Sequence, residues 1–143
     1  MMFSFIANGE PVAQGRPRFT TIGGHARAYD PPKSREYKKL VREVAELAAP
    51  DEPLDGPFKV EITVFKPLLK SFTKQQTREA LSGELRPTKK PDTDNYAKGI
   101  LDAIKKLFWN DDGQVVMLVA EKYYSDVPRI EVSIEEVKTD GSE

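Results

Sequence analysis

The sequence contains no cysteine and a single histidine, and each shortage excludes a kind of site. Without cysteine there is no disulfide framework, no thiolate zinc site and no cysteine nucleophile. One histidine, His25, cannot build a zinc site by itself. A glycine-rich loop of the kind that cradles nucleotide phosphates is also absent, which argues against a nucleotide phosphohydrolase.

Long apolar runs are missing as well. No stretch approaches the ~20 apolar residues of a membrane span, and residues 1–7 lack the basic start and apolar core of a signal peptide. The length of 143 residues suits one domain, and 38% hydrophobic with 31% charged residues is not a disordered composition. We therefore expect one cytoplasmic domain over residues 1–143, with no membrane contact and a frayed polar tail at 138–143.

The formal net charge of −1 conceals two basic segments. Residues 14–42 carry eight Lys and Arg against two acids, and residues 66–90 carry seven against two. Binding to a polyanion depends on the local patch rather than on the total charge, so these segments suit nucleic acid. Taken alone, the charges fit two solvated faces at least as well.

The hydrophobic pattern predicts an α+β domain. Alternating apolar residues indicate strands, and apolar residues at helical spacing indicate helices. Residues 12–32, punctuated by Gly and Pro, are expected to form a long functional or mobile loop. The predicted order is a strand at 3–7, this loop, a helix at 34–49 with Ser34 as N-cap, a strand at 58–64, helices at 73–81 and 94–107, and an antiparallel pair of strands at 115–124 and 129–137. These elements favour a mixed, largely antiparallel sheet with helices packed on one face.

Acidic residues gather around one lysine in the segment Pro91–Lys98. Asp92 and Asp94 point the same way if the chain enters the following helix extended, because alternate residues then share a side. Convergent carboxylates need a compensating cation, and Mg²⁺ takes oxygen ligands while leaving positions for water and phosphate. Lys98 lies one helical turn after Asp94, where it can stabilise negative charge developing on a phosphate. Asp112, in the turn after the helix, is a candidate third carboxylate.

Each of these residues also has an ordinary explanation. Asp94 suits a helix N-cap, and Asp94, Lys98 and Asp102 suit a solvated ladder of charges along one helix face. Asp112, followed by Gly113, suits a simple turn. The functional interpretation gains weight because all these features lie within a short stretch of chain that follows a basic connector.

Together these residues resemble a known family. The pattern Pro91-Asp92-x-Asp94-Asn95-x-x-Lys98-x-x-Leu101-Asp102-Ala103-Ile104, then Asp111-Asp112-x-Gln114-Val115 and Lys122, is similar to the RusA family of Holliday junction resolvases. The N-terminal half agrees, since Gly9-x-Pro11-x-x-x-Gly15-Arg16-Pro17-Arg18 and Tyr29-x-Pro31 resemble the longer branch common in phages and Firmicutes. One departure is Gln14, where that branch often carries Lys. The resemblance covers roughly residues 3–137.

The resemblance implies a Mg²⁺-dependent, homodimeric endonuclease that resolves four-way DNA junctions by paired nicks in DNA recombination and repair. It implies Asp92, Asp94 and Asp112 as metal ligands and catalytic residues, and Lys98 as the catalytic lysine. No small-molecule cofactor is expected. From charge and position, the side chains expected to contact DNA phosphates are Arg16, Arg18, Arg86, Lys89 and Lys90.

Two alternatives stay open at this point. A non-catalytic DNA-binding phage accessory protein on the same scaffold would be signalled by loss of one of the three aspartates, and all three are present. A nuclease with broader specificity for branched or flap DNA would use the same residues, so the sequence does not separate it from a junction resolvase.

Overall fold

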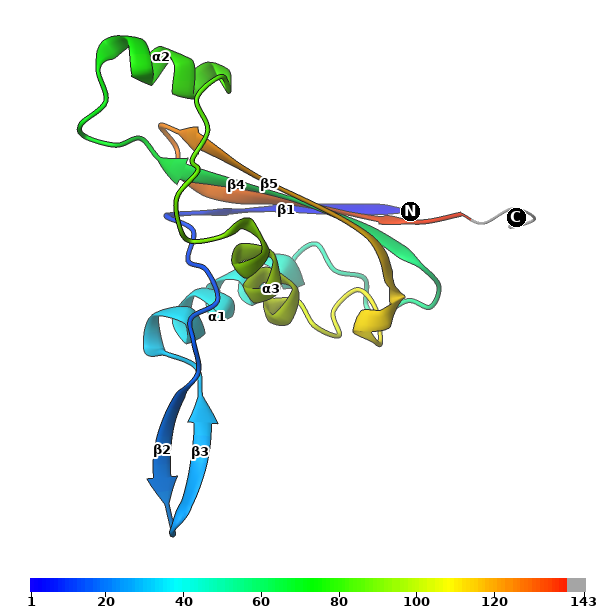
Figure 1. Cartoon of the computed structure of the whole chain (residues 1–143). Helices are drawn as coiled ribbons and strands as arrows, with labels where there is room; N and C mark the ends of the chain where they lie inside the picture. The colour runs from blue at the N-terminus through cyan, green and yellow to red at the C-terminus, as the bar shows by residue number, and fades with distance from the viewer. Residues whose placement is uncertain (139–143) are drawn as a thin grey trace.

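The computed structural model describes residues 1–138, and it confirms an α+β domain built on a mixed, mostly antiparallel sheet (Figure 1). The sheet has four strands in the order β1 (Met2–Asn8), β6 (Arg129–Glu136), β4 (Phe58–Pro67) and β5 (Val115–Ser125). Helices α1 (Pro32–Glu46) and α3 (Thr93–Ala103) lie against one face of it, while α2 (Lys74–Ser82) lies at the end of β4 and β5. Apart from Lys138, the tail expected to fray lies outside the described residues.

The core lies between the sheet and the two helices α1 and α3. Strands β4 and β6 alternate buried and more exposed residues, as half-buried strands must, and their buried side chains face the helices. Phe108 and Trp109, after α3, complete this core and are fully buried. The cluster also includes Phe5, Val41, Phe58, Val60, Ile62, Val64, Tyr96, Ile100, Ile104, Ile130, Val132 and Ile134.

The predicted antiparallel pairing of the last two strands is wrong. Strand β6 pairs antiparallel with β1 and with β4, whereas β5 pairs parallel with β4 at the edge of the sheet. Burial explains the arrangement, because β6 carries three fully apolar inward positions and gains most from a central place. On β5 the inward positions include Leu118, which stays 46% exposed, and Lys122, so the edge suits this strand better.

Helix boundaries differ from the predictions in ways that matter for the site. Helix α1 begins at Pro32, and Ser34 is a buried residue inside its first turn rather than the N-cap. Helix α3 begins at Thr93, with Asp92 as the extended N-cap residue, and it ends at Ala103 rather than near residue 107. Helix α2 agrees with its prediction within a residue at each end, and it carries a capping box between Thr73 and Gln76.

The segment 12–32 is not the irregular loop that its Gly and Pro content predicts. It contains a two-stranded antiparallel hairpin of β2 (Arg18–Ile22) and β3 (His25–Tyr29), joined by Gly23 and Gly24. Both glycines have positive φ, as a two-residue hairpin turn requires. The hairpin projects away from the sheet and the helices (Figure 1).

Candidate active site

Helix α3 presents three charged residues to the surface. Its buried side includes Tyr96, Ala97 and Ile100, which fixes the opposite side as the one that carries Asp94, Lys98 and Asp102. The three charged residues line a groove of about 970 Å³ together with Asp112 and Arg16. The groove also receives Val115, Leu118 and Ala120 from β5.

Asp112 reaches this groove from a short 3-10 helix, η1 (Asp112–Gln114). The turn is held by Gln114, whose Oε1 accepts from the N–H of Asp111 and whose Nε2 donates to the carbonyls of Leu54 and Gly56. The buried Trp109 donates from Nε1 to Asp112 Oδ1 at 3.4 Å. The carboxylate of Asp112 is thus tied to the core on one side and faces the groove on the other.

The structure brings Asp94 and Asp112 into one groove but does not place Asp92 there. The expectation that Asp92 and Asp94 share an extended entry is wrong, because Asp94 already lies in the first turn of α3. Asp92 is the N-cap residue, but only its backbone carbonyl accepts hydrogen bonds from the helix, and its exposed carboxylate makes no capping hydrogen bond. Within residues 1–138 no three acidic or histidine side chains converge closely enough to enclose a metal ion.

Lys98 does not form the ladder of ion pairs with Asp94 and Asp102 that was the ordinary explanation of these residues. Asp102 Oδ2 pairs instead with Lys38 Nζ of α1 at 2.8 Å. Among the described residues, neither Lys98 nor Asp94 takes part in an ion pair within 4 Å. Both charged groups are therefore left available in the groove.

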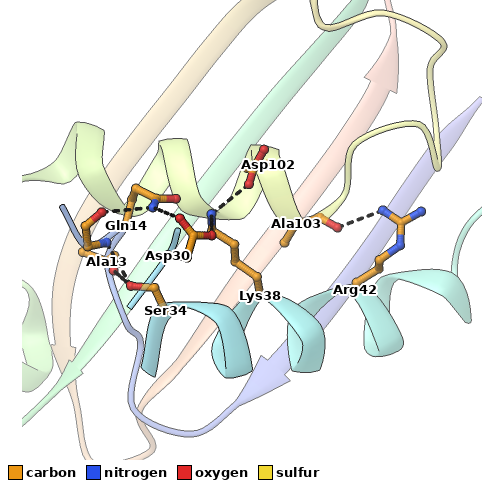
Figure 2. A network of polar contacts seen from close by, with 9 residues as sticks. Ala13, Gln14, Asp30, Ser34, Lys38, Arg42, Asp102 and Ala103 are labelled. Carbon is orange, nitrogen blue, oxygen red and sulfur yellow. Dashed lines mark hydrogen bonds and ion pairs between the residues drawn. The ribbon is translucent and has the colours of Figure 1, made fainter. Parts of the chain in front are cut away.

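Lys38 is a site residue that the sequence did not reveal. Its Nζ lies 2.8 Å from Asp30 Oδ2 and 2.8 Å from Asp102 Oδ2, and Gln14 Nε2 donates to the other oxygen of Asp30 at 3.1 Å. Figure 2 shows these four side chains as a continuous chain of contacts between the hairpin, α1 and α3. The partners of Lys38 are 8 and 64 residues away in the sequence, so no local pattern indicates them.

The protonation equilibria of this network follow from its geometry. The hydrogen bond from Lys38 holds the pKa of Asp30 below its ordinary value of 3.8. Partial burial by itself would lower the pKa of Lys38, but the hydrogen bonds to Asp102 and Asp30 outweigh it and raise that pKa above 10.5. Asp30 and Lys38 are therefore both charged at neutral pH.

The loop before the hairpin also lies directly on α3. The N–H of Gln14 donates to the carbonyl of Asn95 at 3.1 Å, and the N–H of Gly15 donates to Ser34 Oγ at 2.9 Å. A Cβ on Gly99 would come within 3.3 Å of the Gln14 nitrogen, and one on Gly15 within 2.8 Å of Ser34 Oγ. Glycine at these two positions is what permits the close approach.

Comparison with known proteins places this arrangement in a family. Residues 8–135 match the sequence model of the family described as Endodeoxyribonuclease RusA. The chain belongs to the RusA family. It is 45% identical over 135 residues to "Uncharacterized protein YqaN" of Bacillus subtilis strain 168, covering 93% of this chain and 95% of that protein. It is 26% identical over 136 residues to "Crossover junction endodeoxyribonuclease rusA" of Lactococcus phage r1t, covering 94% and 97%.

In this RusA-family chain the basic connector before α3 is held by groups of β5. Lys122 Nζ donates to the carbonyls of Lys89 and Pro91 at 3.1 and 3.0 Å, which fixes the approach to Asp92. Arg86 donates to the carbonyl of Lys122, pairs with Glu121 and stacks its guanidinium 3.8 Å from the ring centroid of Tyr123. Arg86 therefore has a structural role beside its predicted DNA contact, whereas the side chains of Lys89 and Lys90 are exposed.

Lys38→Met tests how much this network stabilises the fold. It keeps most of the aliphatic stem but leaves Asp30 and Asp102 without their cation, so we expect the free energy of unfolding at neutral pH to fall by about 1–3 kcal/mol. Urea denaturation measures this, with Lys39→Met, at the exposed neighbouring position, as the control that should change little.

The same substitution has a defined pH dependence. Because the folded pKa of Asp30 is lowered, its contribution is present above 3.8 and disappears as the pH falls through the lowered folded value. Because the folded pKa of Lys38 is raised, its contribution is present below 10.5 and disappears as the pH rises through the raised value. The stability gap between the wild-type protein and Lys38→Met should therefore shrink in strong acid and strong base, and a gap independent of pH would refute an electrostatic origin.

Proposed function

We propose that this protein is a Mg²⁺-dependent, structure-selective endonuclease that resolves four-way DNA junctions by paired nicks, in the cytoplasm, during DNA recombination and repair. One observation carries the proposal. Asp94, Lys98 and Asp112, which match the family pattern, line a single groove together with the cationic Arg16. Membership of an endodeoxyribonuclease family supports the reaction class, and the printed name of the phage relative supports the junction substrate.

The donor chemistry of the groove fits Mg²⁺. Asp94 and Asp112 offer hard oxygen ligands in the groove. Asp92 lies two residues before Asp94, and its carboxylate is not used as a helix cap. Mg²⁺ in phosphate-processing sites commonly takes one or two carboxylates and completes its shell with water and substrate phosphate. We propose Asp92, Asp94 and Asp112 as the residues that would hold the ion. When bound, the ion neutralises phosphate charge and lowers the pKa of a bound water.

The protein's own residues then position and stabilise the reacting phosphodiester. Lys98 provides a positive charge in the groove, where negative charge develops as the water oxygen bonds to phosphorus and the bond to the 3′ oxygen breaks. The products are a 5′-phosphate and a 3′-hydroxyl. Arg16, Arg18, Lys89 and Lys90 contact neighbouring phosphates, which fixes register without reading bases. The exposed part of Arg86 adds to this surface.

Paired nicks require two such grooves. Each chain supplies one set of catalytic residues, so we propose a homodimer with two-fold symmetry, which matches the symmetry of a four-way junction. Helices that could span a membrane are absent from the described residues, and we propose no small-molecule cofactor.

The proposal is tested by incubating the purified protein with labelled four-way, flap and linear duplex DNA, with Mg²⁺ or with EDTA. We expect symmetric nicks in the four-way junction that depend on Mg²⁺. Asp94→Asn should abolish cleavage to below ~1% of wild type while junction binding persists, because a lost ligand costs several kcal/mol of barrier. Equal cleavage of flaps would indicate the broader branched-DNA nuclease, and binding without cleavage would indicate the accessory protein.

Lys98→Ala tests the catalytic lysine. If Lys98 stabilises charge in the transition state, the single-turnover rate should fall by ~10²-fold or more with little change in DNA affinity. Lys98→Arg should rescue poorly, because a planar fork on a longer side chain displaces the charge. Lys105→Ala removes an exposed lysine just after α3 and serves as the control. An alanine variant within about threefold of the wild-type rate would contradict this role, since exposed charges with no catalytic part contribute little.

A further inference from the structure

Within the part of the chain that the structure describes, no helix or other strand covers the two strands of the β2–β3 hairpin (Figure 1). All five residues of β2 and all five of β3 are exposed, including Phe19 at 72%. A two-stranded hairpin alone is marginally stable in water, so this one gains little for the fold by itself. The exposed residues of both strands are therefore available to bind another molecule.

The strand register divides the hairpin into two different faces. Residues directly opposite each other in an antiparallel pair share a face, and successive residues alternate between faces. One face carries the pairs Arg18 with Tyr29, Thr20 with Arg27, and Ile22 with His25. The other face carries only Phe19 with Ala28 and Thr21 with Ala26. All the cationic side chains of the hairpin therefore lie on the first face, which we call the cationic face.

The hairpin itself contains no acidic residue to balance the charge of this face. No Asp or Glu occurs between Pro11 and Tyr29, while this segment holds Arg16, Arg18 and Arg27. Strands of five residues extend about 17 Å, which matches the rise of roughly five base pairs along the axis of a DNA duplex. Arginine guanidiniums, a threonine hydroxyl and a tyrosine on one narrow face suit contacts to a phosphodiester backbone.

The base of the hairpin is fixed beside the groove. Gln14 and Asp30, just before and just after it, bond to each other, and Asp30 is joined through Lys38 to Asp102 of α3 (Figure 2). Arg16 and Pro17 line the groove itself. A cationic track therefore runs from Lys98 through Arg16 to the hairpin, with its direction set by the network at its base.

We propose that the β2–β3 hairpin is a DNA-binding arm, whose cationic face holds the phosphate backbone of a duplex arm leading away from the cleavage groove. The proposal rests on the proposed function and adds a substrate-binding element to it. DNA is favoured over a second copy of this chain because the charge is concentrated on one face, opposite the apolar residue Phe19. A protein partner would be expected to use the apolar face instead.

Two adjacent threonines provide a matched test on the full-length protein. Thr20→Glu places an acid on the cationic face opposite Arg27, whereas Thr21→Glu places the same acid on the other face opposite Ala26. Both residues are exposed, so folding should be preserved, and thermal unfolding checks this. We expect Thr20→Glu to weaken binding to a four-way junction in EDTA by about tenfold per lost phosphate contact near 0.1 M salt, and Thr21→Glu to stay within about twofold.

Arg18→Gln with Arg27→Gln gives an independent readout. Losing two phosphate contacts should reduce the slope of log affinity against log salt by about two. The control, Lys105→Gln with Lys106→Gln, changes two exposed lysines outside both basic segments and should leave the slope nearly unchanged. Three results would contradict the proposal that the hairpin binds DNA. These are equal effects of the two threonine variants, an unchanged salt slope, and a change of sedimenting mass with Thr20→Glu. If the wild-type protein cleaves junctions, such a result rejects the arm alone. A wild-type protein that binds no branched DNA would reject the proposed function as well.

Discussion

The placement of the groove depends on one ammonium group shared by two carboxylates. Lys38, with a side chain only 14% exposed, holds Asp30 at the end of the hairpin and Asp102 on α3 at 2.8 Å each. A lysine ammonium has three donors, so it can satisfy both carboxylates at once. Burying the ammonium group costs free energy, and the two carboxylates together offset that cost. The result is that the hairpin, α1 and α3 are held together at one point beside the groove.

Features of the chain that depend on local pattern could be predicted from the sequence. The alternation in β4 and the capping residues of α2 gave these elements nearly correct bounds. The pattern around Asp94, Lys98 and Asp112 led to the family, and the structure brings these three residues to one groove. Their assignment as metal ligands and catalytic lysine stays a prediction, because no described feature tests it.

Features that depend on distant contacts could not be predicted. The order of the strands depends on which strand buries the most apolar surface when it lies in the centre of the sheet, with a neighbour on each side. That comparison involves every strand of the sheet. The hairpin was missed because its residues never enter the core, so hydrophobic periodicity carries no signal for it. Asp92 and Asp94 were expected to point together because the start of α3 was placed one residue too late.

The edge position of β5 has a direct consequence for the groove. Neighbouring β4 positions that face the helices are fully buried, whereas Leu118 and Ala120 of β5 remain accessible and line the groove with α3. A strand in the centre of the sheet would have had this face covered by a helix. The same strand also supplies Lys122, which holds the carbonyls of Lys89 and Pro91 and so fixes the segment that leads into Asp92.

The four aspartates that line the groove fall into two pairs with different environments. Asp30 and Asp102 share the single positive charge of Lys38, which offsets half of their combined negative charge, and one oxygen of each is held in the network that positions the hairpin and α3. Within residues 1–138, Asp94 has no ion-pair partner, and the carboxylate of Asp112 receives a single hydrogen bond, from Trp109. A groove in which every carboxylate were paired would have no ligands to offer, and one in which none were paired would repel the phosphates of DNA. Pairing two and leaving two available keeps oxygen donors for a cation while limiting the negative charge that a DNA backbone would meet.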